Sequence, residues 1–313
     1  MKKYSIGVDI GGTTVKIGLF KAEGELLKKW EIVTDKNENG THILGDIAES
    51  IEKVLKEENI SKDDVHGIGI GVPGPVKSDG TVVKCVNLGW GIFNVEEALG
   101  SIIGLKVKAA NDANIAALGE SWQGGGKGYD NMVMVTLGTG VGGGVIIDGK
   151  ILAGVNGAAG EIGHIKVSDD ETEKCGCGKT GCLEQYASAT GVVRMAKKMM
   201  AEKDMPSALR NIEDVTAKDV FDNAKKGDEL ALAVLDKFGK LLGTALAHIS
   251  CVCDPEVYVI GGGVSRAGQI IIDKIVDNYK ESAFHASRNV KFELALLGND
   301  AGIYGGARLC QQI

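Results

Sequence analysis

The chain has 313 residues, a formal net charge of −7 at pH 7 and 44% hydrophobic residues. This length favours two domains, and the acidic balance argues against nucleic acid or an anionic membrane surface as a partner. No apolar run is long enough to span a bilayer and no secretory segment opens the sequence, so we expect a cytoplasmic protein.

Glycine and cysteine are unusual in their number and spacing. The 46 glycines are about twice the usual share, and they cluster in short turns where the backbone can approach a ligand closely. The seven cysteines are odd in number, and three of them fall within eight residues. This pattern argues against a disulfide framework.

The first predicted elements are strands at 4–10 and 15–20, joined by the turn Gly11-Gly12-Thr13-Thr14. Backbone N–H groups in such a turn form an anion-binding concavity, and the threonine hydroxyls can bond phosphate oxygens. Asp9, at the end of the first strand, can hold Mg²⁺ through water. The alternative is a hairpin turn that needs glycine for steric reasons only.

Helices and strands then alternate, with helices predicted at 41–58, 94–103 and 112–122 and strands at 65–72 and 105–109. Asn111 and Asp112 lie between the last strand and the last helix, where open α/β folds place their chemistry. Asp112 can act as a general base toward a hydroxyl group. Simple capping of the helix N-terminus explains the pair equally well.

A second pair of strands, at 131–137 and 142–147, repeats the plan of the first and indicates an internal duplication. Its turn, Gly138-Thr139-Gly140, begins a run rich in glycine, which favours a second phosphate loop with Thr139 as a hydroxyl donor. No Gly-Lys-Ser/Thr follows, as a Walker loop would require, and a strand follows where a dinucleotide fingerprint would need a helix.

The next segment carries a potential metal site. Its four candidate ligands are His164, Cys175, Cys177 and Cys182. One imidazole and three thiolates form a ligand set for tetrahedral zinc, and four protein ligands leave no open position, so the ion would be structural. Glu161 and Glu184 flank this segment, which suggests a substrate pocket. The alternative is a buried core histidine with unrelated cysteines.

Helices and strands also alternate in the remaining chain. Helices are predicted near 183–202, 216–226, 228–253 and 266–280, with a last helix from 300, and strands at 256–260 and 290–296. Such alternation implies an α/β fold. Gly261-Gly262-Gly263 follows the strand at 256–260, and its flat backbone can lie against a purine. A tight turn between strand and helix is the alternative.

These motifs together resemble the ROK family of repressors and sugar kinases. The motifs that carry the resemblance are Asp9-Ile-Gly-Gly-Thr13, Leu137-Gly-Thr-Gly140, Glu161-Ile-Gly-His164, Cys175 to Glu184 and Gly261-Gly-Gly263. The resemblance covers nearly the whole chain; the cysteine segment is its most specific part, whereas wider actin-like ATPases share the glycine loops. Within the family, the sequence is most similar to the bacterial ATP-dependent glucokinases.

The resemblance implies a two-domain actin-like (sugar kinase/ribonuclease H-like) ATPase fold with a cleft between the domains. We expect a small domain of residues 1–110 plus the C-terminal helix at about 301–313. Residues 111–300 would form a large domain that contains the zinc segment. A homodimer or homotetramer is the assembly that the family implies.

The implied reaction is the phosphorylation of glucose at its 6-hydroxyl by ATP. Asp112 would be the base, Asp9 would serve Mg²⁺, and the loops at 11–14, 137–140 and 261–263 would bind the nucleotide. Zn²⁺ would be structural. The residues implied to bind the sugar hydroxyls are Asn87, Asn111, Glu161, His164 and Glu184.

One close alternative and two alternatives of a different class compete with this interpretation. A kinase for an N-acylated aminosugar, such as N-acetylglucosamine or N-acetylmannosamine, would use the same pocket. A sugar-responsive repressor needs a DNA-binding segment before the first phosphate loop, and Asp9 leaves no space for one. An actin-like nucleotide-binding protein without enzymatic activity would not need the zinc–carboxylate cluster.

Overall fold

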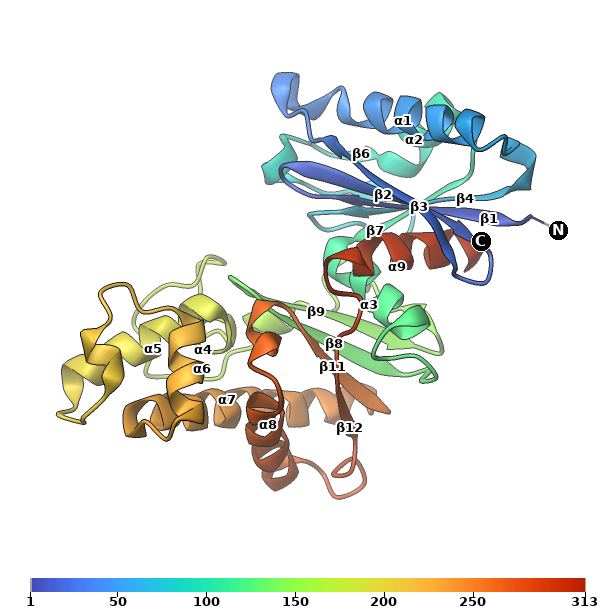
Figure 1. Cartoon of the computed structure of the whole chain (residues 1–313). Helices are drawn as coiled ribbons and strands as arrows, with labels where there is room; N and C mark the ends of the chain where they lie inside the picture. Colours follow the sequence, from blue (N-terminus) through green and yellow to red (C-terminus); the bar gives the residue numbers. More distant parts are fainter. Residues whose placement is uncertain (1, 313) are drawn as a thin grey trace. The chain divides into compact units, whose positions relative to one another are not determined.

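The computed structural model describes residues 2–312, which group by their contacts into two compact units (Figure 1). The first unit comprises the chain up to Asp130, Gly144–Gly160 and the chain from Leu296 onward. The second comprises Asn131–Gly143 and Glu161–Ala295. The sequence predicts a division at residue 110, whereas the contacts place residues 111–130 and Gly144–Gly160 with the first unit.

The first unit is built on a five-stranded sheet in the order β3-β2-β1-β4-β7. The strands are β1 (Tyr4–Ile10), β2 (Thr14–Lys21), β3 (Leu26–Val33), β4 (Val65–Val72) and β7 (Val107–Asn111). β1 pairs antiparallel with β2 and parallel with β4. β4 is almost entirely buried, because strands flank both of its edges and helices cover both faces of the sheet. A separate two-stranded ribbon joins β5 (Thr81–Val82) and β6 (Phe93–Asn94).

The sequence pattern does not predict β3. Its side chains alternate between half-buried and exposed, as expected for an edge strand. Two consecutive lysines interrupt the apolar pattern, and Lys28 is held by Glu57 at 3.0 Å and Glu58 at 2.9 Å. Pairing with β2 therefore makes this segment a strand, in spite of its weak local signal.

Helices cover both faces of the first sheet (Figure 1). On one face lie α1 (Ile43–Glu57) and α2 (Val95–Ile103), and on the other lie α3 (Asp112–Gln123) and α9 (Ala301–Leu309). α9 approaches the sheet so closely that a Cβ at Gly7 would collide with the carbonyl of Ile303, and one at Gly69 with the carbonyl of Gly306. Glycine in β1 and β4 is thus required by backbone packing.

The second sheet has the order β10-β9-β8-β11-β12. Its strands are β8 (Met132–Leu137), β9 (Val141–Ile147), β10 (Lys150–Ile151), β11 (Val257–Gly261) and β12 (Lys291–Leu294). β8 pairs parallel with β11, and β11 with β12. Counted within each sheet, both sheets follow the order third, second, first, fourth, fifth, so the repeat predicted for the hairpins extends to the whole sheet.

The helices of the second unit are α4 (Glu184–Ala187), α5 (Ala189–Glu202), α6 (Ala217–Lys225), α7 (Glu229–Cys253) and α8 (Gln269–Ser282). The prediction of one helix over 183–202 is wrong, because Ser188 has extended backbone angles and its side chain caps α5 by accepting the N–H of Gly191. α7 and α8 meet the sheet through the buried Tyr258 and Tyr279, whose hydroxyls both lie 2.8 Å from Ser250 Oγ.

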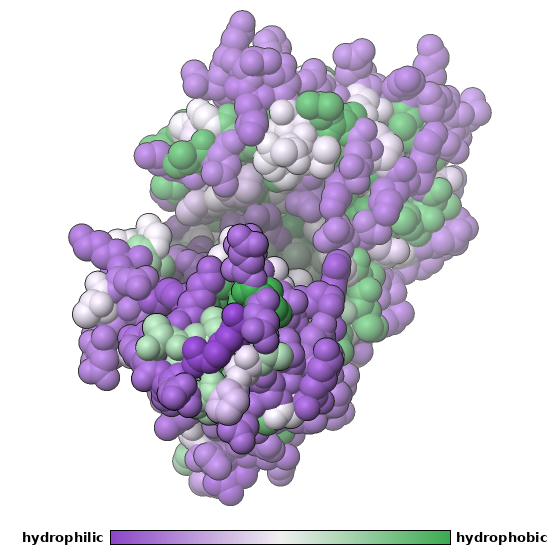
Figure 2. All heavy atoms as spheres, turned by 60° about the vertical axis from the view of Figure 1, so that its left-hand side comes forward, coloured by the Kyte–Doolittle hydropathy of each residue, from purple (hydrophilic) through white to green (hydrophobic). Residues whose placement is uncertain are grey.

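The visible surface in Figure 2 is mostly hydrophilic, with apolar side chains in small groups. Within residues 2–312 no helix combines the length and the apolar character needed to cross a membrane.

The buried carboxylate of Glu120 binds the segment at which the chain re-enters the first unit, at Leu296. Glu120 of α3 is fully buried. Its Oε1 accepts the N–H of Leu297 at 2.8 Å, and its Oε2 accepts those of Leu296 at 3.0 Å and Gly125 at 2.8 Å. Three backbone donors thus compensate for the removal of this charge from water.

A second enclosed carboxylate, Glu171, fastens the loop that leads into the cysteine segment. Its Oε2 accepts hydrogen bonds from Arg194 Nη2 at 2.5 Å and from the Tyr186 hydroxyl at 2.8 Å. The Arg194 guanidinium is the main cause that lowers the pKa of Glu171 to about 2. Because the folded pKa is depressed, the stabilisation is complete above the unfolded pKa and is lost as the pH falls toward the folded value.

We therefore predict that Glu171→Gln lowers the free energy of unfolding at pH 7 by up to about 3 kcal/mol, the equivalent of the pKa shift. The difference from the unmodified protein should shrink below about pH 4.5 and vanish toward pH 2. Urea unfolding followed by circular dichroism at pH 7, 4 and 3 measures it. Glu173→Gln is the matched control, because Glu173 also faces Arg194, at 3.3 Å, but is 68% exposed. Equal effects of the two variants would contradict the prediction.

Candidate functional site

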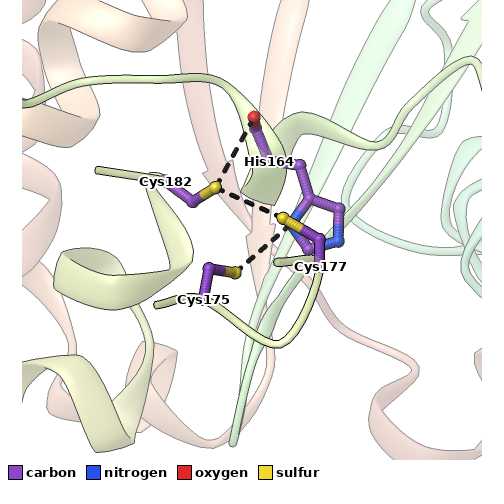
Figure 3. A group of neighbouring side chains, drawn as sticks. All are labelled: His164, Cys175, Cys177 and Cys182. Atoms are coloured by element: carbon purple, nitrogen blue, oxygen red, sulfur yellow. Dashed lines mark hydrogen bonds between the residues drawn. The ribbon is translucent and has the colours of Figure 1, made fainter. Parts of the chain in front are cut away.

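The four predicted metal ligands come together in the second unit (Figure 3). One ligand atom from each of His164, Cys175, Cys177 and Cys182 lies within 4.8 Å of all the others. Cys177 Sγ and Cys182 Sγ are 3.6 Å apart, and Cys175 Sγ is 3.8 Å from His164 Nδ1. A tetrahedral zinc ion with Zn–S bonds of about 2.3 Å separates two sulfurs by about 3.7 Å, so the donor set fits this ion.

The protein affects the three thiols differently. Burial raises the pKa of Cys182 to about 12 and raises that of Cys175, whereas the backbone N–H of Lys179 lowers the pKa of Cys177. Three thiolates so close together need a positive charge to offset their own, and a bound Zn²⁺ would supply it.

Gln185 holds the cysteine segment in place, although the sequence pattern does not predict this role. Its Oε1 accepts the N–H groups of Gly181 at 2.8 Å and Cys182 at 3.1 Å, and its Nε2 donates to the carbonyl of Glu173 at 2.9 Å. No local motif marks this residue, because its role depends on how the loop folds back onto α4.

The two flanking glutamates lie differently about this cluster. Glu161 Oε2 is 3.9 Å from His164 Nε2, the ring nitrogen that faces away from Cys175. Glu184 reaches in two directions: its Oε1 is 3.6 Å from Cys175 Sγ, and its Oε2 accepts the N–H of Val141 at 3.0 Å. Glu184 therefore connects the cysteine cluster with the second glycine loop.

The second glycine loop presents unpaired amides. Gly138 N–H donates to the carbonyl of Gly140 at 3.0 Å, but among residues 2–312 the N–H groups of Thr139 and Gly140 have no hydrogen-bond partner. A Cβ at Gly138 would meet no atom within 4 Å, so protein packing does not require glycine there. Free amides and open space are what a phosphate group needs.

A cavity of about 440 Å³ lies beside Gly263, the end of the third glycine motif. Its walls are mainly apolar and include two cations and one anion. The lining residues are Ala189, Thr216, Ala217, Lys218, Phe221, Asp222, Gly263, Val264, Arg266 and Ala267. The sequence does not predict the contribution of α6, because this helix is remote from Gly263 in the chain. The shape and lining suit a purine base.

The first glycine loop repeats the features of the second within the first unit. Gly11 N–H donates to the carbonyl of Thr14 at 3.0 Å, whereas the N–H groups of Gly12 and Thr13 have no partner among residues 2–312. A Cβ at Gly12 would again meet no atom within 4 Å. This loop can therefore bind phosphate in the same way.

Asp9 and Asp112 form a pair of carboxylates in the first unit. Burial, and then the negative charge of Asp112, raise the pKa of Asp9 to about 6, although Lys16 acts in the opposite direction. The carboxylate is enclosed by the backbone of α9, since a Cβ at Gly302 would lie 2.5 Å from Asp9 Oδ2. A divalent cation would relieve the repulsion between the two acids, so Asp9 fits a role toward Mg²⁺.

Asn111 caps the N-terminus of α3. Its Oδ1 accepts the N–H groups of Ala113 at 3.0 Å and Asn114 at 3.3 Å, and its Nδ2 donates to the carbonyl of Gly74 at 3.2 Å. Asp112 Oδ1 also accepts the N–H of Ala113, at 2.8 Å. Asn111 is therefore the capping residue of α3, and Asp112 is the first residue of this helix.

The remaining candidates divide between the units. Asn87 lies on a short 3₁₀ turn (Val86–Leu88) of the first unit and is exposed. The first unit thus contains Asp9, residues 11–14, Asn87, Asn111 and Asp112, and the second contains the metal ligands, Glu161, Glu184 and the other two glycine motifs.

One known protein family matches this chain in sequence. Residues 5–313 match the model of the ROK family. A glucokinase of Halalkalibacterium halodurans is 45% identical over 99% of this chain and 96% of its own length. An N-acetylgalactosamine kinase of Shewanella sp. strain ANA-3 is 32% identical over 97% of this chain and 95% of its own length.

Among solved structures, a ROK family glucokinase from Streptomyces griseus in complex with glucose and AMPPNP is 32% identical, with a TM-score of 0.73, and the match covers 99% of this chain and 100% of that chain. The order of the motifs, the repeated sheet and these matches lead to one conclusion: the chain belongs to the ROK family.

Proposed function

We propose that this protein transfers the γ-phosphate of ATP to the 6-hydroxyl of glucose, giving glucose 6-phosphate and ADP. The observation that carries the proposal is the double contact of Glu184, which places a carboxylate able to bind a sugar hydroxyl between the cysteine cluster and a loop with free amides. The similar glucokinase of H. halodurans and the glucose and AMPPNP complex of the S. griseus enzyme support glucose and ATP as substrates.

The sugar is uncharged and carries many hydroxyls, so carboxylates and amides suit its recognition. We assign this role to Asn87, Asn111, Glu161, His164 and Glu184. His164 Nε2 can serve the sugar, because Nδ1 faces the sulfur of Cys175. A bound zinc ion would fix the orientation of this ring and of the cysteine segment. Each hydroxyl that is held in place reduces the freedom of the 6-hydroxyl relative to the phosphate.

Phosphoryl transfer depends on positioning and on neutralisation of charge more than on covalent chemistry. Asp112 would accept the proton of the 6-hydroxyl as the oxygen attacks. The free amides of the loops at 11–14 and 138–140 would bind phosphate oxygens, and the cavity beside Gly263 would hold the purine. Mg²⁺ would neutralise phosphate charge near Asp9. A cytoplasmic location and a homodimeric or homotetrameric assembly belong to the same proposal, on the family resemblance alone.

A coupled assay across glucose, N-acetylglucosamine, N-acetylmannosamine, mannose and fructose tests the choice of substrate. We expect the highest kcat/KM with glucose. An N-acylated aminosugar as the best substrate would replace glucose in the proposal, and the relative from Shewanella makes this the main alternative. Absence of turnover with all five sugars would reject a hexose kinase.

We predict that Asp112→Ala lowers kcat by about 10²- to 10⁴-fold, the usual contribution of a general base. Glucose binding measured by calorimetry should remain within a few-fold of the unmodified protein, because other residues hold the sugar. Asp204→Ala, at an exposed aspartate, is the matched control and should keep full activity. Substantial turnover by the Asp112 variant would remove this residue as the base.

We predict that Cys177→Ser loses metal and glucose affinity together, because the ligand set also orients His164 and Glu184. Elemental analysis should find about one zinc per chain in the unmodified protein and much less in the variant. Cys251→Ser changes an exposed cysteine on α7 and should alter neither quantity. A metal-free preparation that binds glucose normally would contradict the assignment.

A further inference from the structure

Both phosphate-binding loops are fastened by a threonine from a distant segment. Thr34, which directly follows β3, donates its Oγ1 hydroxyl to the carbonyl of Gly11 at 2.8 Å and its N–H to the carbonyl of Thr13 at 3.0 Å. Its side chain is nearly fully enclosed, with the residue 4% exposed. The hydroxyl bond is therefore shielded from competition with water.

Thr190 makes the corresponding contact to the second loop, although this residue is exposed and its Oγ1 also lies 2.9 Å from Ser188 Oγ. Its Oγ1 donates to the carbonyl of Thr139 at 2.9 Å, and the preceding residue, Ala189, donates its N–H to the carbonyl of Gly138 at 2.8 Å. Both residues begin α5, immediately after the break at Ser188. The break in the helix predicted over 183–202 thus puts two donors in front of the loop.

These contacts determine which way the free amides point. In a trans peptide unit, the carbonyl of one residue and the N–H of the next lie in one plane and point in opposite directions. The carbonyl of Gly11 shares its unit with the N–H of Gly12, and the carbonyl of Thr139 shares its unit with the N–H of Gly140. Each threonine hydroxyl therefore holds the far side of a peptide whose N–H has no protein partner.

Holding these units matters because glycine readily adopts other backbone angles. Rotation of either unit would replace an N–H by a carbonyl oxygen, which repels phosphate. A pre-oriented amide needs no reorganisation when the anion binds.

We propose that Thr34 and Thr190 are positioning residues: within its own unit, each holds one glycine N–H, that of Gly12 or that of Gly140, in the orientation that binds a phosphate group. This inference rests on the proposed kinase function, since it presumes that both loops bind phosphate. Neither threonine needs to touch the substrate.

The test replaces each threonine by valine, which keeps the shape of the side chain and removes the hydroxyl. Calorimetry with AMPPNP should show about 3- to 10-fold weaker binding for Thr34→Val, the usual effect of one lost hydrogen bond, and a smaller loss for Thr190→Val, whose hydrogen bond is exposed to water. KM for ATP should rise by a similar factor while KM for glucose stays unchanged. Thr34→Ser and Thr190→Ser keep the hydroxyl and should restore nucleotide binding.

Thr244→Val is the matched control, because the Thr244 hydroxyl contacts Ser282 at 3.2 Å and neither loop. AMPPNP affinity of the Thr34 and Thr190 valine variants equal to that of this control would overturn the proposal. So would an equal rise of KM for ATP and for glucose, or a failure of the serine variants to recover. If the unmodified protein binds AMPPNP but phosphorylates none of the five sugars, the proposed function fails while the inference about the loops is still decided by calorimetry.

Discussion

The carboxylate of Glu184 makes the two contacts that connect the parts of the second unit's candidate site. It lies between Cys175 Sγ and the N–H of Val141. Glu184 opens α4 only two residues after Cys182, so any ion that fixes the thiols also fixes this carboxylate. A bound ion would therefore hold the groups that we propose for sugar recognition and would support the loop that we propose for phosphate binding. The cysteine cluster and the loop at 138–140 therefore act as one connected group.

Glycine in the strands that pack against α9 and glycine in the candidate ligand loops have two separate physical causes. At Gly7 and Gly69 a side chain would collide with the backbone of α9, so glycine there allows the close packing of helix on sheet. At Gly12, Gly138 and Gly263 a Cβ would meet nothing within 4 Å, so packing within the protein gives no reason for glycine. A ligand that approaches the backbone closely gives one. Composition alone does not separate these two groups, whereas the space around each residue does.

Three enclosed carboxylates show how their surroundings decide their roles. Glu120 accepts three backbone N–H groups, and Glu171 is held by Arg194 and Tyr186, so both charges are compensated and both residues fasten loops. Asp9 has no hydrogen-bond donor among residues 2–312 and lies near the like charge of Asp112, which together with burial raises its pKa to about 6. Such a poorly compensated acid is typical of a functional position.

The sequence by itself determined the parts whose signal is local: the strand–glycine–strand units, the Asn111–Asp112 junction and the four predicted metal ligands, which are close in the chain and meet within 4.8 Å in space. Tertiary structure alone decided that Leu26–Val33 is a strand, that the helix over 183–202 breaks at Ser188, and that Thr34 and Thr190 reach the two loops. It also decided that α6 forms a wall beside Gly263. The physical reason is that these features arise from contacts between segments remote in the chain, for which propensity and spacing leave no local pattern.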